Sequence, residues 1–218
     1  MAYILREQLY EYKHNIRIKY YTHVRTRFAV KLRKRLKNDN FSILCSNCIG
    51  GTIYNRLGKQ FLSPTINLWF YQKDFLKFIQ NIHYYLSLEL RFIKSNRNYP
   101  VGMLDDICIY FLHYNSEEEA KTSWNRRKER INFDNLFIIM YDRDGIDEED
   151  YEVFARLKFV NRIMLSDKAN YNYPFVKQMT KENDNDTVYL DKDKYGIRSF
   201  EKQWNYVDWL NKRDNIGE

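Results

Sequence analysis

The first stretch of the chain carries its apolar residues in a helical pattern. Residues 1–38 contain no glycine or proline, and apolar side chains recur there at steps of three or four residues. This spacing predicts one apolar stripe on a helix or on a helix pair. The stripe consists of Leu5, Leu9, Tyr12, Ile16, Tyr20, Val24, Phe28 and Leu32.

The pattern that follows predicts a buried strand, a glycine turn and a helix. The apolar run 41–44 is too short for an isolated helix and is typical of a strand. The pair Gly50-Gly51 then allows backbone dihedrals that are closed to other residues. We expect Thr52 to cap the following helix and Gly58 to end it.

Strand and helix patterns alternate through the rest of the chain. Strands are predicted at 66–70, 106–113, 135–141 and 162–166. Helices are predicted at 71–93, 117–131, 148–157 and 200–210, with irregular structure at 99–106 and 168–195. This alternation predicts an α/β fold, namely a three-layer α/β/α sandwich around a mainly parallel or mixed, Rossmann-like sheet. We expect residues 39–218 to form this single domain, preceded by a basic amphipathic helical segment over 1–38.

The composition fits a globular domain. Hydrophobic residues at 44% supply a core, and only three prolines and seven glycines argue against disorder. Three cysteines (Cys45, Cys48 and Cys108) make no disulfide framework, which indicates a reducing cytoplasm. No apolar run approaches the ~18 residues of a membrane span. We therefore expect a cytoplasmic protein, with peripheral association at the inner face of the cell membrane as an open option.

The positive charge is concentrated in the N-terminal segment. Residues 1–40 hold eleven Lys and Arg residues and three acids, a net charge of +8, whereas the whole chain carries +7. Such a segment suits three roles. It can lie on an anionic membrane surface, bind nucleic acid through phosphates, or pack on the body with its charges in water. Nucleic acid is the least favoured partner, because the chain has no zinc, helix-turn-helix or RNP-type pattern.

Polar segments follow several of the predicted strands. In open α/β sheets, ligands bind beyond the carboxyl ends of the strands, and here those ends carry 46–51, 113–114 and 142–144. A helix N-terminus after Gly50-Gly51 would offer free N–H groups to a phosphate or carboxylate. The alternative is that the two glycines only form a tight turn.

Acid–base and metal chemistry have candidates at two of these ends. Asp142-Arg143-Asp144 follows a buried strand, and two carboxylates in such a turn can hold a divalent cation such as Mg²⁺ or Mn²⁺. The alternative is a turn that caps the next helix. His113 is a candidate general base, or else a histidine that hydrogen-bonds to the backbone.

Two further candidates are cationic and nucleophilic. Arg126, Arg127 and Arg130 share one predicted helix and suit a clamp on phosphate or carboxylate. They could instead pair with neighbouring acids. Cys48 lies near a predicted helix N-terminus, where a lowered pKa would make it a nucleophile. The alternative is a buried structural cysteine.

A family resemblance is carried by four segments, CSNCIGGTIYNRLGKQFLSPTINL, YPVGMLDDICIYFLHYNSEEEAKTSWNRRKERIN, NLFIIMYDRDG and WNYVDWLNK. Together they resemble a bacterial family of exopolysaccharide biosynthesis proteins, whose domain is known as domain of unknown function nineteen-nineteen. The resemblance covers roughly residues 40–212. The family tends to Ser-Asn-Asn-Cys where this chain has Cys45-Ser46-Asn47-Cys48, so one amide is lost. The motif positions that recur are Asn47, Cys48, Gly50, Gly51, Pro64, Tyr99, Pro100, Gly102, Asp105, His113, Tyr114, Trp124, Arg126, Arg127, Arg130, Asp142, Arg143 and Asp144.

The resemblance implies a cytoplasmic transferase that works on sugars at the membrane. We hypothesise a glycosyl- or acyltransferase of exopolysaccharide or capsule biosynthesis that acts on a nucleotide- or lipid-linked sugar. The residues expected to carry the chemistry are His113, Cys48, Asp142 and Asp144, the last two also as cation ligands. Those expected to contact the ligand are Asn47, Gly50, Gly51, Asp105, Tyr114, Arg126, Arg127, Arg130 and Arg143. The alternative function is a non-catalytic accessory module of the polysaccharide assembly machinery.

Overall fold

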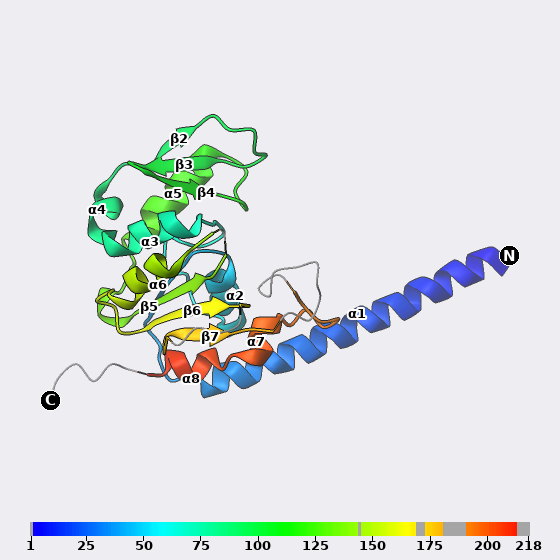
Figure 1. Cartoon of the computed structure of the whole chain (residues 1–218). Helices are drawn as coiled ribbons and strands as arrows, with labels where there is room; N and C mark the ends of the chain where they lie inside the picture. Colours follow the sequence, from blue (N-terminus) through cyan, green and yellow to red (C-terminus); the bar gives the residue numbers. More distant parts are fainter. Residues whose placement is uncertain (1, 144, 169–172, 181–190, 213–218) are drawn as a thin grey trace.

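The N-terminal segment folds as one long helix. The structure, a computed structural model, describes residues 2–143, 145–168, 173–180 and 191–212. Helix α1 (Ala2–Arg35) has 34 residues and ends in three cations, which suit the negative end of the helix dipole. Its last part packs on the body through Phe28 and Leu32, Tyr20 and Tyr21 contact the ring of Tyr195, and the earlier turns extend away (Figure 1).

The predicted apolar stripe of α1 is therefore covered at one end only. Tyr12, Ile16 and Tyr20 are 65%, 49% and 55% exposed. Among the described helices, none combines the length and the apolar character that crossing a bilayer requires.

The main sheet has four parallel strands in the order β1, β5, β6, β7. All six residues of the central strand β5 are buried, as expected for a strand covered on both faces. The predicted strands at 135–141 and 162–166 are confirmed. The short strand β7 lies where the sequence predicted irregular structure, because its three residues are too few and too polar to form a pattern. The strands are β1 (Ser42–Cys45), β5 (Leu136–Tyr141), β6 (Arg162–Ser166) and β7 (Val176–Gln178).

Successive side chains of these strands face two different cores, as the pleat requires. Leu44, Ile138 and Met140 face one core, and Ile43 and Ile139 face the other. Helices cover both faces (Figure 1), so the predicted three-layer α/β arrangement is confirmed. The first core is completed by α3 (Gln72–Gln80), α5 (Glu117–Lys128) and α6 (Glu148–Ala155). The second is completed by the end of α1, α2 (Ile49–Leu57), α7 (Ser199–Gln203) and α8 (Tyr206–Leu210).

A second, antiparallel sheet packs beyond the first core, on the side away from α1 (Figure 1). A tight turn with Asp105 at φ 51° joins its last two strands. The predicted strand at 106–113 thus belongs to this sheet and not to the parallel one, and the region expected as a loop at 99–106 contains a strand. The strands are β2 (Arg91–Ile93), β3 (Val101–Leu104) and β4 (Ile107–Tyr110).

Two predictions in the middle of the chain were wrong. The stretch 66–70 is partly buried but forms no strand of the main sheet, because Asn67 has φ 63° and interrupts an extended chain. The predicted helix 71–93 divides into α3, α4 (Ile82–Ser87) and β2, because Asn81 has φ −126° and leaves the helical region.

The later helices agree better with the sequence. Ser116 caps α5, since its Oγ accepts the N–H of Glu119 at 3.1 Å, and α6 lies within the predicted 148–157. The closing helix divides into α7 and α8 because Trp204 is extended, with φ −127° and ψ 121°.

Candidate functional site

The carboxyl ends of β1 and β5 are tied together by hydrogen bonds. Ser46 follows β1, and its Oγ accepts the N–H of Tyr141 at 3.2 Å. The Ser46 carbonyl accepts the N–H of Phe70 at 3.0 Å, and Asp142 N–H donates to Leu165 O at 2.8 Å. The segments after β1, β5 and β6 and the stretch near residue 70 therefore meet at one edge of the sheet, which we call the carboxyl edge.

Asn47 places a side-chain amide at this edge with only half of its hydrogen-bonding capacity used. Its Oδ1 accepts the N–H of Ile49 at 3.0 Å and the thiol of Cys45 at 3.3 Å, which fixes the turn into α2. The side chain is buried, and its Nδ2 has no partner among the described residues. A buried donor without an acceptor costs about 1–3 kcal/mol, so it calls for an explanation.

Cys48 is the N-cap of α2 and is half-buried. Burial raises the pKa of its thiol, and the nearby guanidinium groups of Arg198 and Arg143 lower it by less. The lowered pKa that a cysteine nucleophile needs is therefore not found, and the thiol is neutral at pH 7. Because both guanidinium groups act on the Cys48 thiol, Arg143 and Arg198 lie near the start of α2. Arg143 also lies over the ring of Trp69, at 5.4 Å from its centroid.

The two glycines lie in the first turn of α2 and not in a loop before it, because the helix begins at Ile49. A Cβ on Gly50 would lie 3.0 Å from Cys45 Cβ, whereas one on Gly51 would lie 3.5 Å from Ile66 Cγ2. Gly50 therefore lets α2 approach β1 closely. The predicted end of this helix at Gly58 is confirmed by its φ of 66°.

Asp142 is buried and accepts hydrogen bonds on both carboxylate oxygens. Oδ2 accepts Ser166 Oγ at 2.8 Å and the hydroxyl of Tyr151, and Oδ1 accepts Lys168 Nζ at 2.6 Å. No group of three or more His, Cys, Asp or Glu side chains suited to a metal occurs in the described residues. Both oxygens of Asp142 thus already have partners within the protein, and Asp144, the second predicted cation ligand, lies outside the described residues.

His113 and Tyr114, the two candidate residues that follow β4, differ in their surroundings. The His113 side chain is exposed, while its backbone N–H donates to Asn67 O at 3.2 Å, beside the carboxyl edge. Tyr114 is buried; its hydroxyl donates to Ile66 O at 2.9 Å and accepts from Arg127 Nη1 at 2.5 Å. Tyr114 and the buried Arg127 thus hold the chain around Ile66, which is a structural role.

The remaining predicted ligand residues lie elsewhere. Asp105 is at the hairpin tip of the small sheet, where its carboxylate accepts the hydroxyl of Tyr84 at 2.8 Å. The end of α5 leads to Asn132, whose N–H donates to Ser42 Oγ at the start of β1. Arg130 therefore lies toward the amino edge of the sheet, and Arg126 is exposed on the preceding turn. The predicted arginine clamp does not join the carboxyl edge.

Three side chains at the edge were not predicted from the sequence. Ser166 and Lys168 could have been found, because they follow β6 as Asp142 follows β5. Arg198 comes from the N-cap of α7, and no local pattern connects it to Cys48.

Comparison with other proteins identifies the family. The model of a domain of unknown function, DUF1919, matches residues 19–211. The chain is also 36% identical over 203 residues to an uncharacterized protein of Haemophilus influenzae, a match that covers 89% of this chain and 97% of that protein. The chain therefore belongs to the DUF1919 family.

Proposed function

We propose that the carboxyl edge binds a phosphate-bearing sugar compound and that the protein is a transferase of exopolysaccharide or capsule biosynthesis. The observation that supports this is the buried Asn47 Nδ2, which lacks an acceptor at the start of α2. A ligand oxygen would supply that acceptor on displacing the side chains that cover Nδ2. The link to polysaccharide synthesis rests on the family resemblance.

The charges around Asn47 favour an anionic ligand. The N–H of Ile49 already donates to Asn47 Oδ1, but the start of α2 still carries the positive end of the helix dipole. Arg143 and Arg198 lie close enough to influence the neighbouring thiol. Asp142 in turn holds the ammonium group of Lys168 at the same edge. These cations favour a phosphate or carboxylate over a neutral sugar.

His113 is the candidate proton acceptor in this proposal. Its side chain is exposed, its backbone N–H donates to Asn67 O, and an imidazole nitrogen can accept a proton from a bound substrate. Asp142 acts as a positioning residue, because its oxygens already accept from Tyr151, Ser166 and Lys168.

The test is calorimetric titration with a panel of sugar nucleotides and acetyl-coenzyme A, with and without manganese. We expect one sugar nucleotide to bind. Asn47→Asp keeps the Oδ1 acceptor for Ile49 but replaces the donor with a negative oxygen. It should weaken binding roughly tenfold to 100-fold, since a lost hydrogen bond to a charged group costs about 1.5–3 kcal/mol.

The matched control is Asn132→Asp, which adds the same charge at the amino edge of the sheet. Binding should be unchanged in that variant. The proposal is overturned if no compound in the panel binds the folded protein, or if Asn47→Asp binds as tightly as the wild type.

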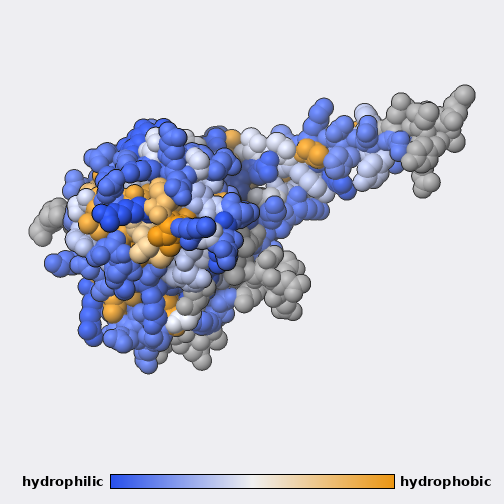
Figure 2. All heavy atoms as spheres, turned by 90° about the horizontal axis from the view of Figure 1, so that it is seen from above, coloured by the Kyte–Doolittle hydropathy of each residue, from blue (hydrophilic) through white to orange (hydrophobic). Residues whose placement is uncertain are grey.

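The exposed length of α1 supports a second candidate function, an accessory module that docks on an anionic membrane. Tyr10, Tyr12, Ile16 and Tyr20 are exposed there between basic residues. Figure 2 shows this part of α1 as largely hydrophilic with isolated apolar side chains. That mixture suits the interface of a bilayer and not its interior.

A further inference from the structure

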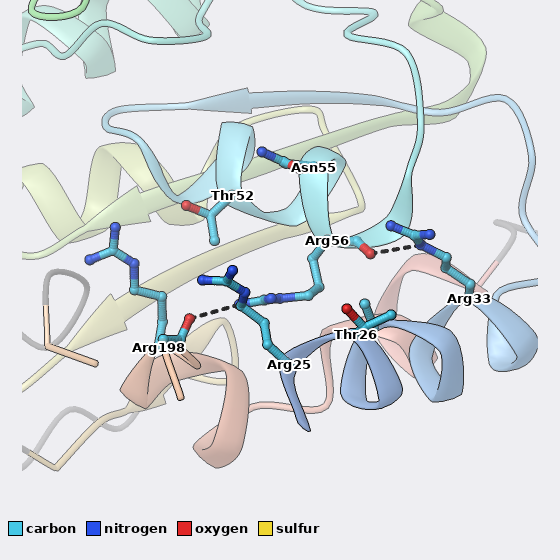
Figure 3. A pocket seen from close by; sticks show the side chains of 9 residues that line it. Arg25, Thr26, Arg33, Thr52, Asn55, Arg56 and Arg198 are labelled. Carbon is cyan, nitrogen blue, oxygen red and sulfur yellow. Dashed lines mark hydrogen bonds between the residues drawn. The ribbon is translucent and has the colours of Figure 1, made fainter. Parts of the chain in front are cut away.

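A cavity of about 450 Å³ lies between α1, α2 and the segment that enters α7. Four arginines line it, Arg25, Arg33, Arg56 and Arg198, together with polar side chains of α2, and none of its lining residues is acidic. Figure 3 shows these arginines coming from three separate elements toward the space beside α2. We call this cavity the arginine pocket.

Only part of this positive charge is compensated within the protein. Arg56 donates two hydrogen bonds of 2.7 Å to the buried carboxylate of Glu201. Arg33 donates to a backbone carbonyl, that of Arg56, at 3.0 Å. Within the described ranges, neither Arg25 nor Arg33 has a carboxylate at ion-pair distance. The pocket therefore keeps at least two positive charges that an anion can pair with.

The backbone is shaped to hold these two guanidinium groups. A Cβ on Gly196 would lie 3.1 Å from Arg25 Nη1, and a Cβ on Gly58 would lie 3.1 Å from Arg33 Cζ. Both glycines also have positive φ, 77° and 66°, which other residues rarely adopt. Each arginine thus lies flat against a position where a side chain would displace it.

The arginine pocket adjoins the carboxyl edge. Thr52 lines the pocket, and its Oγ1 donates to Cys48 O at 3.1 Å. Arg198 lines the pocket and also acts on the Cys48 thiol. A ligand can therefore contact the pocket and the edge at once.

We propose that the arginine pocket and the adjoining start of α2 together bind the diphosphate group of a sugar diphosphate, with the sugar extending along the carboxyl edge. Guanidinium groups match phosphate oxygens bidentately, and several of them suit an anion with more than one charge. The assignment of the sugar end rests on the proposed function, whereas the diphosphate site does not. The diphosphate can come from a nucleoside diphosphate or from a lipid-linked diphosphate.

The experiment is calorimetric titration of the full chain with inorganic pyrophosphate, uridine diphosphate and farnesyl diphosphate. Arg25 is exposed, so Arg25→Gln should fold. We expect this variant to bind each diphosphate at least tenfold more weakly. Tighter binding of uridine diphosphate than of pyrophosphate supports a nucleotide source, and tighter binding of farnesyl diphosphate supports a lipid source.

The matched control is Arg27→Gln, which removes one charge from the same helix about 200° around its axis. Binding should stay unchanged in it. The diphosphate site is overturned if pyrophosphate does not bind the folded wild type, or if the two variants bind alike. The Asn47→Asp variant separates the two proposals. If it binds both pyrophosphate and the sugar nucleotide as tightly as the wild type, the proposed function is refuted, whereas the diphosphate site in the arginine pocket is not.

Discussion

The carboxylate of Asp142 shows how one residue can lie at the predicted edge and still have an unpredicted role. Its oxygens accept from Tyr151, Ser166 and Lys168 in the interior of the protein. A metal ion would have to displace the Lys168 ammonium group, which already supplies the positive charge. The residue therefore fixes Lys168, whose side chain is 43% exposed, at the edge of the sheet.

The reactivity of Cys48 follows from its burial. Because burial raises its pKa above the ordinary 9.0, the thiolate is scarcer than in a free cysteine at any pH below that value. We expect alkylation of Cys48, followed by mass spectrometry against pH, to have a midpoint above 9.0. Cys45 serves as the internal comparison, since burial raises its pKa to about 12. A Cys48 midpoint clearly below 9.0 would restore the nucleophile hypothesis.

At the scale of elements, the contact between α2 and β1 depends on one of two adjacent glycines. A Cβ at Gly50 would lie 3.0 Å from the Cβ of Cys45, which belongs to a fully buried strand. At Gly51 the corresponding distance of 3.5 Å is an ordinary van der Waals contact. The same substitution at neighbouring positions should therefore have opposite effects.

We expect Gly50→Ala to lower the free energy of unfolding by about 1–3 kcal/mol, as overpacking in a core does. Gly51→Ala should leave it unchanged or raise it by up to ~1 kcal/mol, because alanine reduces the conformational entropy of the unfolded chain where its side chain fits. Urea unfolding followed by circular dichroism measures both values. Equal losses in the two variants would contradict the packing explanation.

The elements that the sequence predicted are those with long or uninterrupted patterns. The buried strand β5 and the capped helix α5 are examples, since each has a local signal at the right length. The antiparallel sheet was missed because its strands have three or four residues and partly exposed side chains.

At the candidate site, Asn47 and Asp142 were placed correctly because both follow parallel strands. The positions of Arg126, Arg130 and Asp105 were not predicted correctly. Helix spacing and turn chemistry do not determine which edge of the sheet such side chains reach.

At the scale of the whole molecule, α1 combines two environments in one helix. Its last turns carry Arg25 and Arg33 into the arginine pocket and Leu32 into the core. Its earlier turns expose aromatic and basic side chains to solvent (Figure 1). No sequence pattern separates these parts, because the basic residues continue through both. Only the packing against α2 and α8 decides which arginines face the body.

The exposed part of α1 gives the membrane proposal a direct test. We expect the full chain to sediment with phosphatidylserine-containing vesicles and not with pure phosphatidylcholine. Replacing Lys13, Arg17 and Lys19 by glutamine should weaken this binding by on the order of 100-fold, since each cation contributes about 1 kcal/mol near an anionic surface. The control replaces Arg156, Lys158 and Lys177, which are exposed on the body.

If both triple variants lose binding equally, the attraction comes from net charge and α1 is not the docking element. If only the α1 variant loses it, the helix is a membrane anchor whose base forms one wall of the arginine pocket, and a lipid-linked diphosphate would reach that pocket from the bilayer surface.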